Sequence, residues 1–145
     1  MHTNLDTSGN PFTDQEPWHS GWLELMKYTD LVMLDIKQID EQEHIKLTGH
    51  SNKNILAMAR ELSDMKKPVW IRHVLVPDGS DKDEYLHRLA DFIHTLSNVE
   101  RVEVLPYHTL GKFKWENLGL SYPLEGVNPP TQERIDNARK ILGAI

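Results

Sequence analysis

The feature that most constrains the fold is a regular alternation of short β-branched runs with longer amphipathic segments. The clearest run is D-L-V-M-L-D-I at residues 30–36. Strands of this kind that alternate with helical patterns favour βα units around a parallel sheet. We therefore predict an α/β fold with strands at residues 2–5, 30–36, 68–76 and 99–105, and helices at residues 17–27, 41–47, 52–66, 82–96 and 131–142.

Turn and capping residues mark the ends of these segments. Ser51 is the predicted N-cap of the helix that follows it, and Thr131 is the predicted N-cap of the last helix. Residues 109–130 hold three glycines and three prolines, so we predict a long loop there.

The length and the amino-acid content narrow the classes of protein. A chain of 145 residues suffices for one core, and we expect a single domain over residues 1–145. The absence of cysteine excludes disulfides, thiolate zinc sites and a thiolate-held iron–sulfur cluster from these residues. The formal charge of -6 argues against a nucleic-acid partner, which needs a basic surface. No apolar run approaches membrane length and no signal-peptide pattern is present, so we expect a cytoplasmic protein without a membrane partner.

Charged side chains occur in or just after the predicted strands. Side chains alternate between the faces of a strand, which puts Asp35 and Lys37 on one face at the end of the second strand. Arg72 lies inside the apolar third strand, Asp6 follows the first strand and His108 follows the fourth. Ligands of parallel α/β folds bind beyond the carboxyl ends of the strands. These five residues therefore predict a polar site at that edge.

Each residue type also has a structural interpretation: the strand-end aspartates Asp6 and Asp35 as solvated turn residues, Lys37 as a surface lysine, Arg72 as a structural partner of Asp35, and His108 as a loop histidine. Taken together they indicate more, because charged residues rarely interrupt buried strands without a partner. Lys and Arg side chains bind carboxylates or phosphates, while Asp carboxylates hold ammonium groups or metal ions. The residues alone thus indicate a ligand that carries both signs of charge, as an amino acid does.

The other polar and aromatic residues give no comparable signal. No glycine-rich phosphate loop is present, and the tryptophans are expected in the core or an interface. The remaining histidines show no metal-ligand spacing; they are His2, His19, His44, His50, His73, His87 and His94.

Four strings of residues, in a fixed order, carry a resemblance to a known family. They are H-T-x-L-D-T-x-G at 2–9, T-D-L-V-M-L-D-I-K-Q at 29–38, V-W-I-R-x-V-x-V-P at 69–77 and N-V-E-R-V-E-V-L-P-Y-H-x-L-G-K-x-K-W at 98–115. Over essentially the whole chain, the sequence resembles the C-terminal part of the radical S-adenosylmethionine enzymes that activate glycyl-radical enzymes, of the pyruvate formate-lyase type.

The resemblance implies βα repeats that form part of a partial, TIM-like (β/α)6 barrel. In this family a [4Fe-4S] cluster reductively cleaves S-adenosylmethionine, and the resulting radical removes a hydrogen atom from a glycine of pyruvate formate-lyase. A flavodoxin or a ferredoxin-type protein is the implied reductant of the full enzyme.

The resemblance also assigns roles to residues of this chain. Asp6, Asp35, Lys37, Arg72 and His108 resemble residues that line the S-adenosylmethionine pocket. A second set matches positions around a monovalent cation beside the carboxylate of that ligand: Asp6, Thr7, Met33 and Asp35.

The sequence departs from the family in what it lacks. The C-x-x-x-C-x-x-C cluster motif and the G-G-E segment, which grips the amino group of the ligand, are absent, and Asp78 stands where the family usually has glycine. We therefore expect a fragment that has no catalytic residues of its own, is inactive alone, and self-associates through the side that the missing part would cover.

Two other interpretations remain open at this stage. The chain could be a cofactor-free interaction module that docks the lyase or complements a separate cluster-bearing chain. It could also be a different barrel-derived enzyme that uses the same polar edge with a divalent metal.

Overall fold

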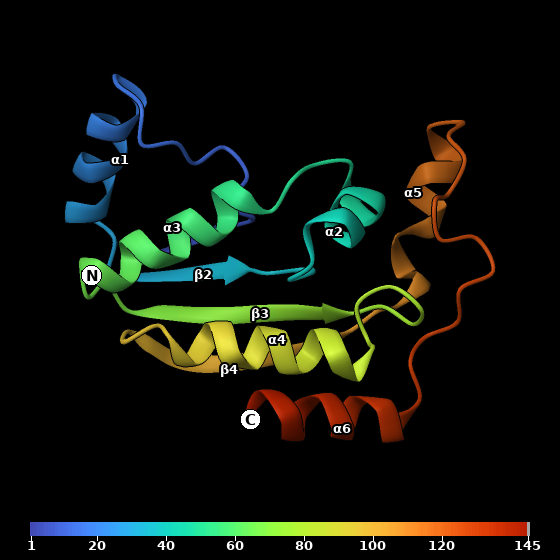
Figure 1. The fold of residues 1–145 in the computed structure, drawn as a ribbon. Helices are drawn as coiled ribbons and strands as arrows, with labels where there is room; N and C mark the ends of the chain where they lie inside the picture. The colour runs from blue at the N-terminus through green and yellow to red at the C-terminus, as the bar shows by residue number, and fades with distance from the viewer. Residues whose placement is uncertain (145) are drawn as a thin grey trace.

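Four parallel strands form one sheet in the order β1-β2-β3-β4. The structure is a computed structural model and describes residues 1–144. Each strand pairs with the next one in the sequence, which confirms the predicted α/β fold of repeated βα units (Figure 1). The strands are β1 (Asn4–Thr7), β2 (Leu31–Asp35), β3 (Val69–Leu75) and β4 (Val99–Pro106).

The helices lie close to their predicted places: α1 (Trp18–Lys27), α2 (Glu41–Thr48), α3 (Lys53–Asp64), α4 (Asp83–His94) and α6 (Gln132–Leu142). The Thr131 hydroxyl accepts a hydrogen bond from the Arg134 N–H at 3.3 Å, which confirms this N-cap. Strand β1 begins two residues later than predicted, so Asp6 lies inside the strand and not after it.

Two predictions about local structure were wrong. Residues 109–130 are not one continuous loop, because they contain a 3₁₀ turn (Thr109–Gly111) and the short helix α5 (Lys112–Asn117). A helix of one to two turns between two glycines has too few residues to give a periodic signal. The N-cap position of α3 is Asn52, which makes no side-chain capping bond, whereas the Ser51 hydroxyl accepts from the Lys53 N–H at 3.2 Å and donates to Glu41 at 2.8 Å.

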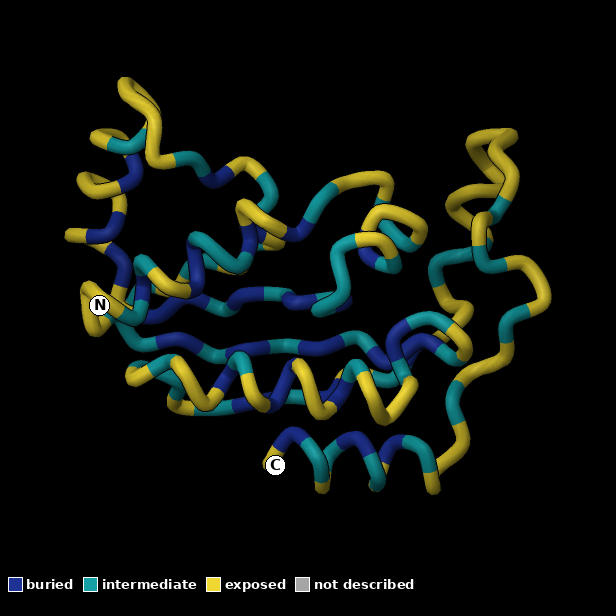
Figure 2. Tube along the Cα trace, in the orientation of Figure 1, coloured by how far each residue is buried: buried dark blue, intermediate teal, exposed yellow. Residues whose placement is uncertain are grey.

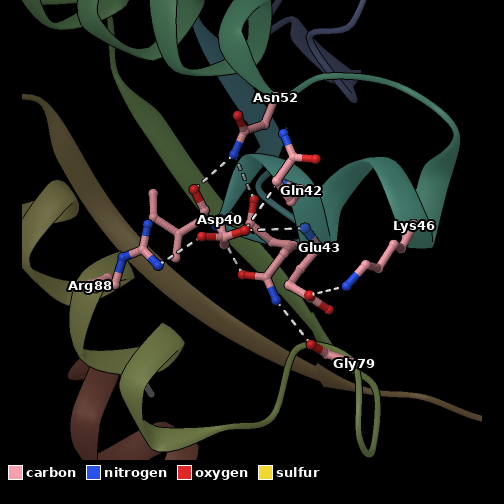
Figure 3. Close-up of polar contacts among 9 residues, drawn as sticks. Asp40, Gln42, Glu43, Lys46, Asn52, Gly79 and Arg88 are labelled. Carbon is pink, nitrogen blue, oxygen red and sulfur yellow. Dashed lines mark hydrogen bonds and ion pairs between the residues drawn. The ribbon is translucent and has the colours of Figure 1, made fainter.

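Asn52 and Asp40 organise the turn that follows β2. The Asn52 amide donates to the carbonyl oxygens of Gln38 at 3.0 Å and Ile39 at 2.8 Å (Figure 3). The Asp40 carboxylate accepts from two N–H groups at the start of α2 and from Arg88 of α4 at 3.0 Å. This turn therefore fixes the position of α2 beyond the carboxyl end of β2.

One face of the sheet packs against the helices and forms the core. Val32 and Leu34 of β2 and Ile71 of β3 are fully buried there. Buried residues of α1, α3, α4 and α6 belong to the same cluster. In Figure 2 the buried positions follow the strands and one side of each of these helices.

The opposite face of the sheet is only partly covered. Met33 in β2 and Trp70, Arg72 and Val74 in β3 are all partly exposed, and they alternate with the buried core residues. Arg101 of β4 places its guanidinium 4.9 Å from the Trp70 ring centre. The candidate site residues lie on this open face or beyond its carboxyl end.

A glycine at the end of β1 brings the following loop against the core. Gly9 has a φ of +68°, and a Cβ atom there would lie 3.0 Å from Leu34 Cδ1 and 3.2 Å from Met58 Sδ. Its N–H donates to the Thr7 hydroxyl at 3.0 Å. The loop after β1 thus requires both the left-handed backbone and the missing side chain.

Replacing Gly9 with alanine is expected to lower the free energy of unfolding by about 2 kcal/mol, from left-handed strain and from overpacking. Urea unfolding followed by circular dichroism measures this. Gly49 is the matched control, because it has a φ of +81° with no atom within 4 Å of a built Cβ. Gly49→Ala should cost only the backbone strain, about 1 kcal/mol, and equal losses in the two variants would contradict the packing argument.

Candidate functional site

A cluster of opposite charges joins three neighbouring strands on the open face. Arg72 of β3 donates from Nε to Asp35 Oδ1 of β2 at 2.8 Å. The same guanidinium donates from Nη1 to Asp6 Oδ2 of β1 at 3.0 Å and also pairs with Asp6 Oδ1 through Nη2. The sheet register aligns Asp35 directly with Arg72. The parallel pairing therefore brings together residues that lie far apart in the sequence.

The environment of Arg72 keeps its guanidinium charged. Burial acts to lower the pKa of Arg72, but hydrogen bonds to Asp6 and then to Asp35 act in the opposite direction and leave the pKa above its ordinary value. The Arg72 side chain is 18% exposed and that of Asp35 is 17% exposed, whereas the side chain of Asp6 is 55% exposed. One oxygen-rich side of the cluster thus still faces open space.

Lys37 adds a second cation at the end of β2. Its Nζ lies 3.7 Å from Asp35 Oδ2, the carboxylate oxygen that Arg72 does not use. The Lys37 side chain is 37% exposed, so its ammonium group can still contact a ligand. Asp35 is consequently held between two cations.

His108 is not bonded to the other four candidate residues. It is exposed, follows β4 directly and precedes the 3₁₀ turn. Within residues 1–144 it forms no hydrogen bond or ion pair with Asp6, Asp35, Lys37 or Arg72. The structure therefore joins four of the five predicted pocket residues through ion pairs and leaves the fifth as a separate group on the next strand end.

The residues predicted around a monovalent cation already have partners within the chain. Asp6 and Asp35 both bind Arg72. The Thr7 hydroxyl accepts from the Gly9 N–H, and Met33 Sδ lies 4.0 Å from the Asn4 amide nitrogen. Across residues 1–144, no three His, Cys, Asp or Glu side chains are grouped so as to hold a metal ion. The monovalent cation therefore stays a prediction.

A pocket of about 190 Å³ adjoins the cluster at the carboxyl end of β2. Sequence reasoning missed several of its residues, because Ser8 and Asn10 lie in a loop and His44 follows no metal-ligand spacing. Only the fold brings them next to Asp35. The pocket is lined by Ser8, Asn10, Asp35, Lys37, His44, Thr48, His50 and Ile55.

No helix in residues 1–144 combines the length and the apolar character that crossing a bilayer requires.

The sequence matches no protein-family model. Solved structures nevertheless share the fold. A domain of the pyruvate-formate lyase-activating enzyme from Bacteroides vulgatus superposes with a TM-score of 0.76 at 21% identity, covering 99% of this chain and 76% of that one. A radical SAM methyltransferase from Sphaerobacter thermophilus has a TM-score of 0.66 at 18% identity, covering 97% and 37% respectively.

Two relatives that are much more similar in sequence carry the same name. The chain is 55% identical over 142 residues to the pyruvate formate-lyase-activating enzyme of Streptococcus mutans. The matched region covers 98% of this chain and 54% of that protein. It is 54% identical to the enzyme of the same name from Staphylococcus epidermidis, with 98% and 57% covered. The chain spans about half the length of these relatives. It is, over nearly all of its length, a homologue of the pyruvate formate-lyase-activating enzymes, with the α/β fold of radical SAM enzyme domains.

Proposed function

We propose that this chain is the C-terminal part of a pyruvate formate-lyase-activating enzyme and that it holds one side of the S-adenosylmethionine pocket. In the full enzyme, S-adenosylmethionine and a [4Fe-4S] cluster supply the radical chemistry that converts a glycine of pyruvate formate-lyase to its radical form. A flavodoxin or ferredoxin-type protein is the proposed reductant. The identity of 55% over 142 residues to an enzyme of this name carries the proposal.

The proposed roles follow from the charges at the strand ends. Lys37 binds the carboxylate of the ligand. Asp35 orients Lys37 through their ion pair, and Arg72, itself paired with Asp35, orients Asp6. The exposed oxygens of Asp6 take a cation or the ammonium group of the ligand. His108 reaches the ligand from the next strand end. The mixed charge of the cluster fits an amino-acid-like ligand, whereas an iron–sulfur cluster does not fit these residues, because the chain has no cysteine.

A chimera tests the function directly. The 142 residues that match in the Streptococcus mutans enzyme are replaced by this chain, and the purified, reconstituted chimera is incubated with pyruvate formate-lyase and S-adenosylmethionine. We expect a glycyl-radical signal in electron paramagnetic resonance. A chimera that folds and carries its cluster, yet never produces this signal, would reject the proposed function. Lys37→Ala in the chimera should reduce radical yield, while Lys66→Ala on the exposed turn after α3 serves as the control.

The isolated chain is expected to bind S-adenosylmethionine weakly, because only one side of the proposed pocket is present. We expect an affinity poorer than roughly micromolar, which corresponds to about -8 kcal/mol. Isothermal titration calorimetry measures it, with the complete Streptococcus mutans enzyme as the positive control. Micromolar or tighter binding by the isolated chain would mean that these residues form a complete pocket by themselves.

Self-association is the second expected property of the isolated chain. Strand β1 lies at the edge of the sheet, and exposed strand edges pair readily with other chains. The partly covered face with Met33 and Trp70 adds apolar surface, as do the exposed side chains of Leu110, Phe113 and Leu118. Sedimentation velocity should give a sedimentation coefficient that rises with protein concentration. A strictly monomeric species with cooperative unfolding would argue that the open face needs no cover.

A further inference from the structure

Buried polar side chains gather around the segment that carries Lys37. Strand β2 ends at Asp35, so Lys37 lies in the irregular turn that follows the strand. Burying a polar group costs free energy unless it is hydrogen-bonded. Several such groups in one place therefore indicate that the backbone around Lys37 is held in one conformation. The buried polar residues that bond this turn, or the neighbouring turn after β3, are Gln38, Asn52, His73 and Ser80.

His73 holds the peptide bond that leads into Lys37. It lies on the buried face of β3, at a position that the alternation of the strand would give to an apolar side chain. Its Nδ1 lies 2.8 Å from the carbonyl oxygen of Ile36, which belongs to the peptide bond between residues 36 and 37. The N–H of Ile36 donates to the Arg72 carbonyl oxygen at 2.9 Å. Residue 36 is thus tied to β3 through both of its backbone groups.

The position of the hydrogen on the His73 ring decides whether this bond exists. The other ring nitrogen, Nε2, lies 3.3 Å from the carbonyl oxygen of Ser80, so both nitrogens face acceptors. Burial lowers the pKa of His73, although the contacts with the two carbonyls act in the opposite direction. The neutral ring has a single N–H. The shorter contact assigns this hydrogen to Nδ1, and hence to the carbonyl that precedes Lys37.

The other side of Lys37 is held by the turn after β3. The Gln38 amide donates to the carbonyl oxygen of Gly79 at 2.9 Å (Figure 3). The Ser80 hydroxyl accepts from the Val76 N–H at 2.9 Å, which closes this turn. Lys37 therefore lies between two anchored residues, and both anchors come from β3 or from the turn that follows it.

We propose that His73 is a positioning residue that directs Lys37 towards Asp35 and towards the ligand by fixing the peptide bond before Lys37. A lysine has a long and flexible stem, so the direction of its ammonium group depends on where its backbone is held. The role of Lys37 towards a ligand carboxylate rests on the proposed function. The effect of His73 on Lys37 does not, and it can be measured without any ligand.

Nuclear magnetic resonance of the histidine ring nitrogens tests the first step in the isolated chain at neutral pH. We expect the His73 ring to carry its hydrogen on Nδ1. His73→Asn identifies the signals of this ring, because it removes them. A hydrogen on Nε2 alone would leave the Ile36 carbonyl unbonded and would overturn the inference, whatever the stability of any variant.

Three substitutions separate positioning from a general structural role. His73→Leu fills the buried site but has no donor for the Ile36 carbonyl. His73→Asn keeps an amide nitrogen near the place of Nδ1 and can still donate to that carbonyl. Ile71→Val is the matched control, because it removes a methylene from the same buried face of β3 without removing a hydrogen bond.

The mobility of the Lys37 side chain is the readout, measured by carbon relaxation in the isolated chain. In His73→Leu we expect the order parameter of its terminal carbon to fall to the value of Lys66, which is exposed. In His73→Asn and Ile71→Val it should stay near the original value. An equal fall in Ile71→Val would mean that the whole sheet has loosened, and no fall in His73→Leu would mean that Lys37 is held by other contacts; either result would reject the positioning role.

The Streptococcus mutans chimera connects this role with the proposed function. His73→Leu should raise the KM for S-adenosylmethionine about fivefold, the size expected for the net contribution of one hydrogen bond, with little change in kcat. His73→Asn should restore the original KM. A chimera that never activates the lyase, while Lys37 still becomes mobile in His73→Leu, would reject the proposed activity and retain the positioning role. An active chimera whose KM is unchanged by His73→Leu would reject the positioning role and retain the activity.

Discussion

After anaerobic reconstitution with iron and sulfide, the isolated chain is expected to retain no iron–sulfur cluster. Protein-bound clusters of this type are held by cysteine thiolates, and none of the 145 residues is cysteine. Across the described residues 1–144, no three His, Asp or Glu side chains are grouped so that they could replace the thiolates as iron ligands. Iron and acid-labile sulfide analysis after gel filtration should therefore give values at the blank level.

The Streptococcus mutans chimera is the positive control for this measurement, since it adds the part of the relative that this chain does not match. Under the same treatment it should gain iron and the visible absorption of a cluster. A stoichiometric cluster in the purified, cysteine-free chain would contradict the prediction and would require ligands other than thiolates.

Replacing Arg72 with methionine is expected to lower the free energy of unfolding by about 3 kcal/mol. The substitution keeps an apolar stem but leaves Asp6 and Asp35 facing each other without their shared cation. Removing one partner from a largely buried ion pair is costly, and only the Lys37 ammonium, 3.7 Å from Asp35 Oδ2, would remain to balance the two carboxylates. The estimate is below the upper end of that range because Asp6 is 55% exposed and its charge is partly screened by water.

Chemical denaturation of a short series isolates this effect. Arg60→Met is the control, because Arg60 is exposed on α3 and lies over the Phe92 ring. This substitution should lower the free energy of unfolding by about 0.5 kcal/mol. Adding Asp35→Asn to Arg72→Met should recover part of the lost stability by removing one carboxylate. Equal stabilities of the Arg72 and Arg60 variants would mean that the charged cluster contributes nothing to folding.

The strand pattern was readable from the sequence because it depends on local alternation. The run at 30–36 predicted a strand that ends near Asp35, and the structure buries Val32 and Leu34 while Asp35 lies on the open face. The two-residue period of β3 puts Arg72 on the same open face. The pairing of Arg72 with Asp35, which was its structural interpretation, is present at 2.8 Å.

Features that depend on several elements at once could not be predicted. The surroundings of His44 depend on the carbonyl of His50, six residues away, and on a pocket whose other walls come from the loop after β1 and the end of β2. Helix α5 is too short for periodicity to show it. The contact of His108 with the other site residues was expected from its place after β4, yet His108 is exposed where the chain leaves β4 and enters the 3₁₀ turn, and the charged cluster consists of residues from β1, β2 and β3 with Lys37.

The sequential strand order has a consequence for how the chain acquires its structure. Every strand pairs with the one that precedes it in the sequence, so each βα unit can dock as soon as it has been synthesised. Each step then closes only the loop of one βα crossover, which costs less loop-closure entropy than a pairing between strands from distant parts of the chain. The contact from Arg72 to Asp6 spans 66 positions and bridges two strands that do not pair directly. It forms only after β2 has been enclosed between its neighbours, so the completed charge cluster reports that the first three strands have assembled in the correct register.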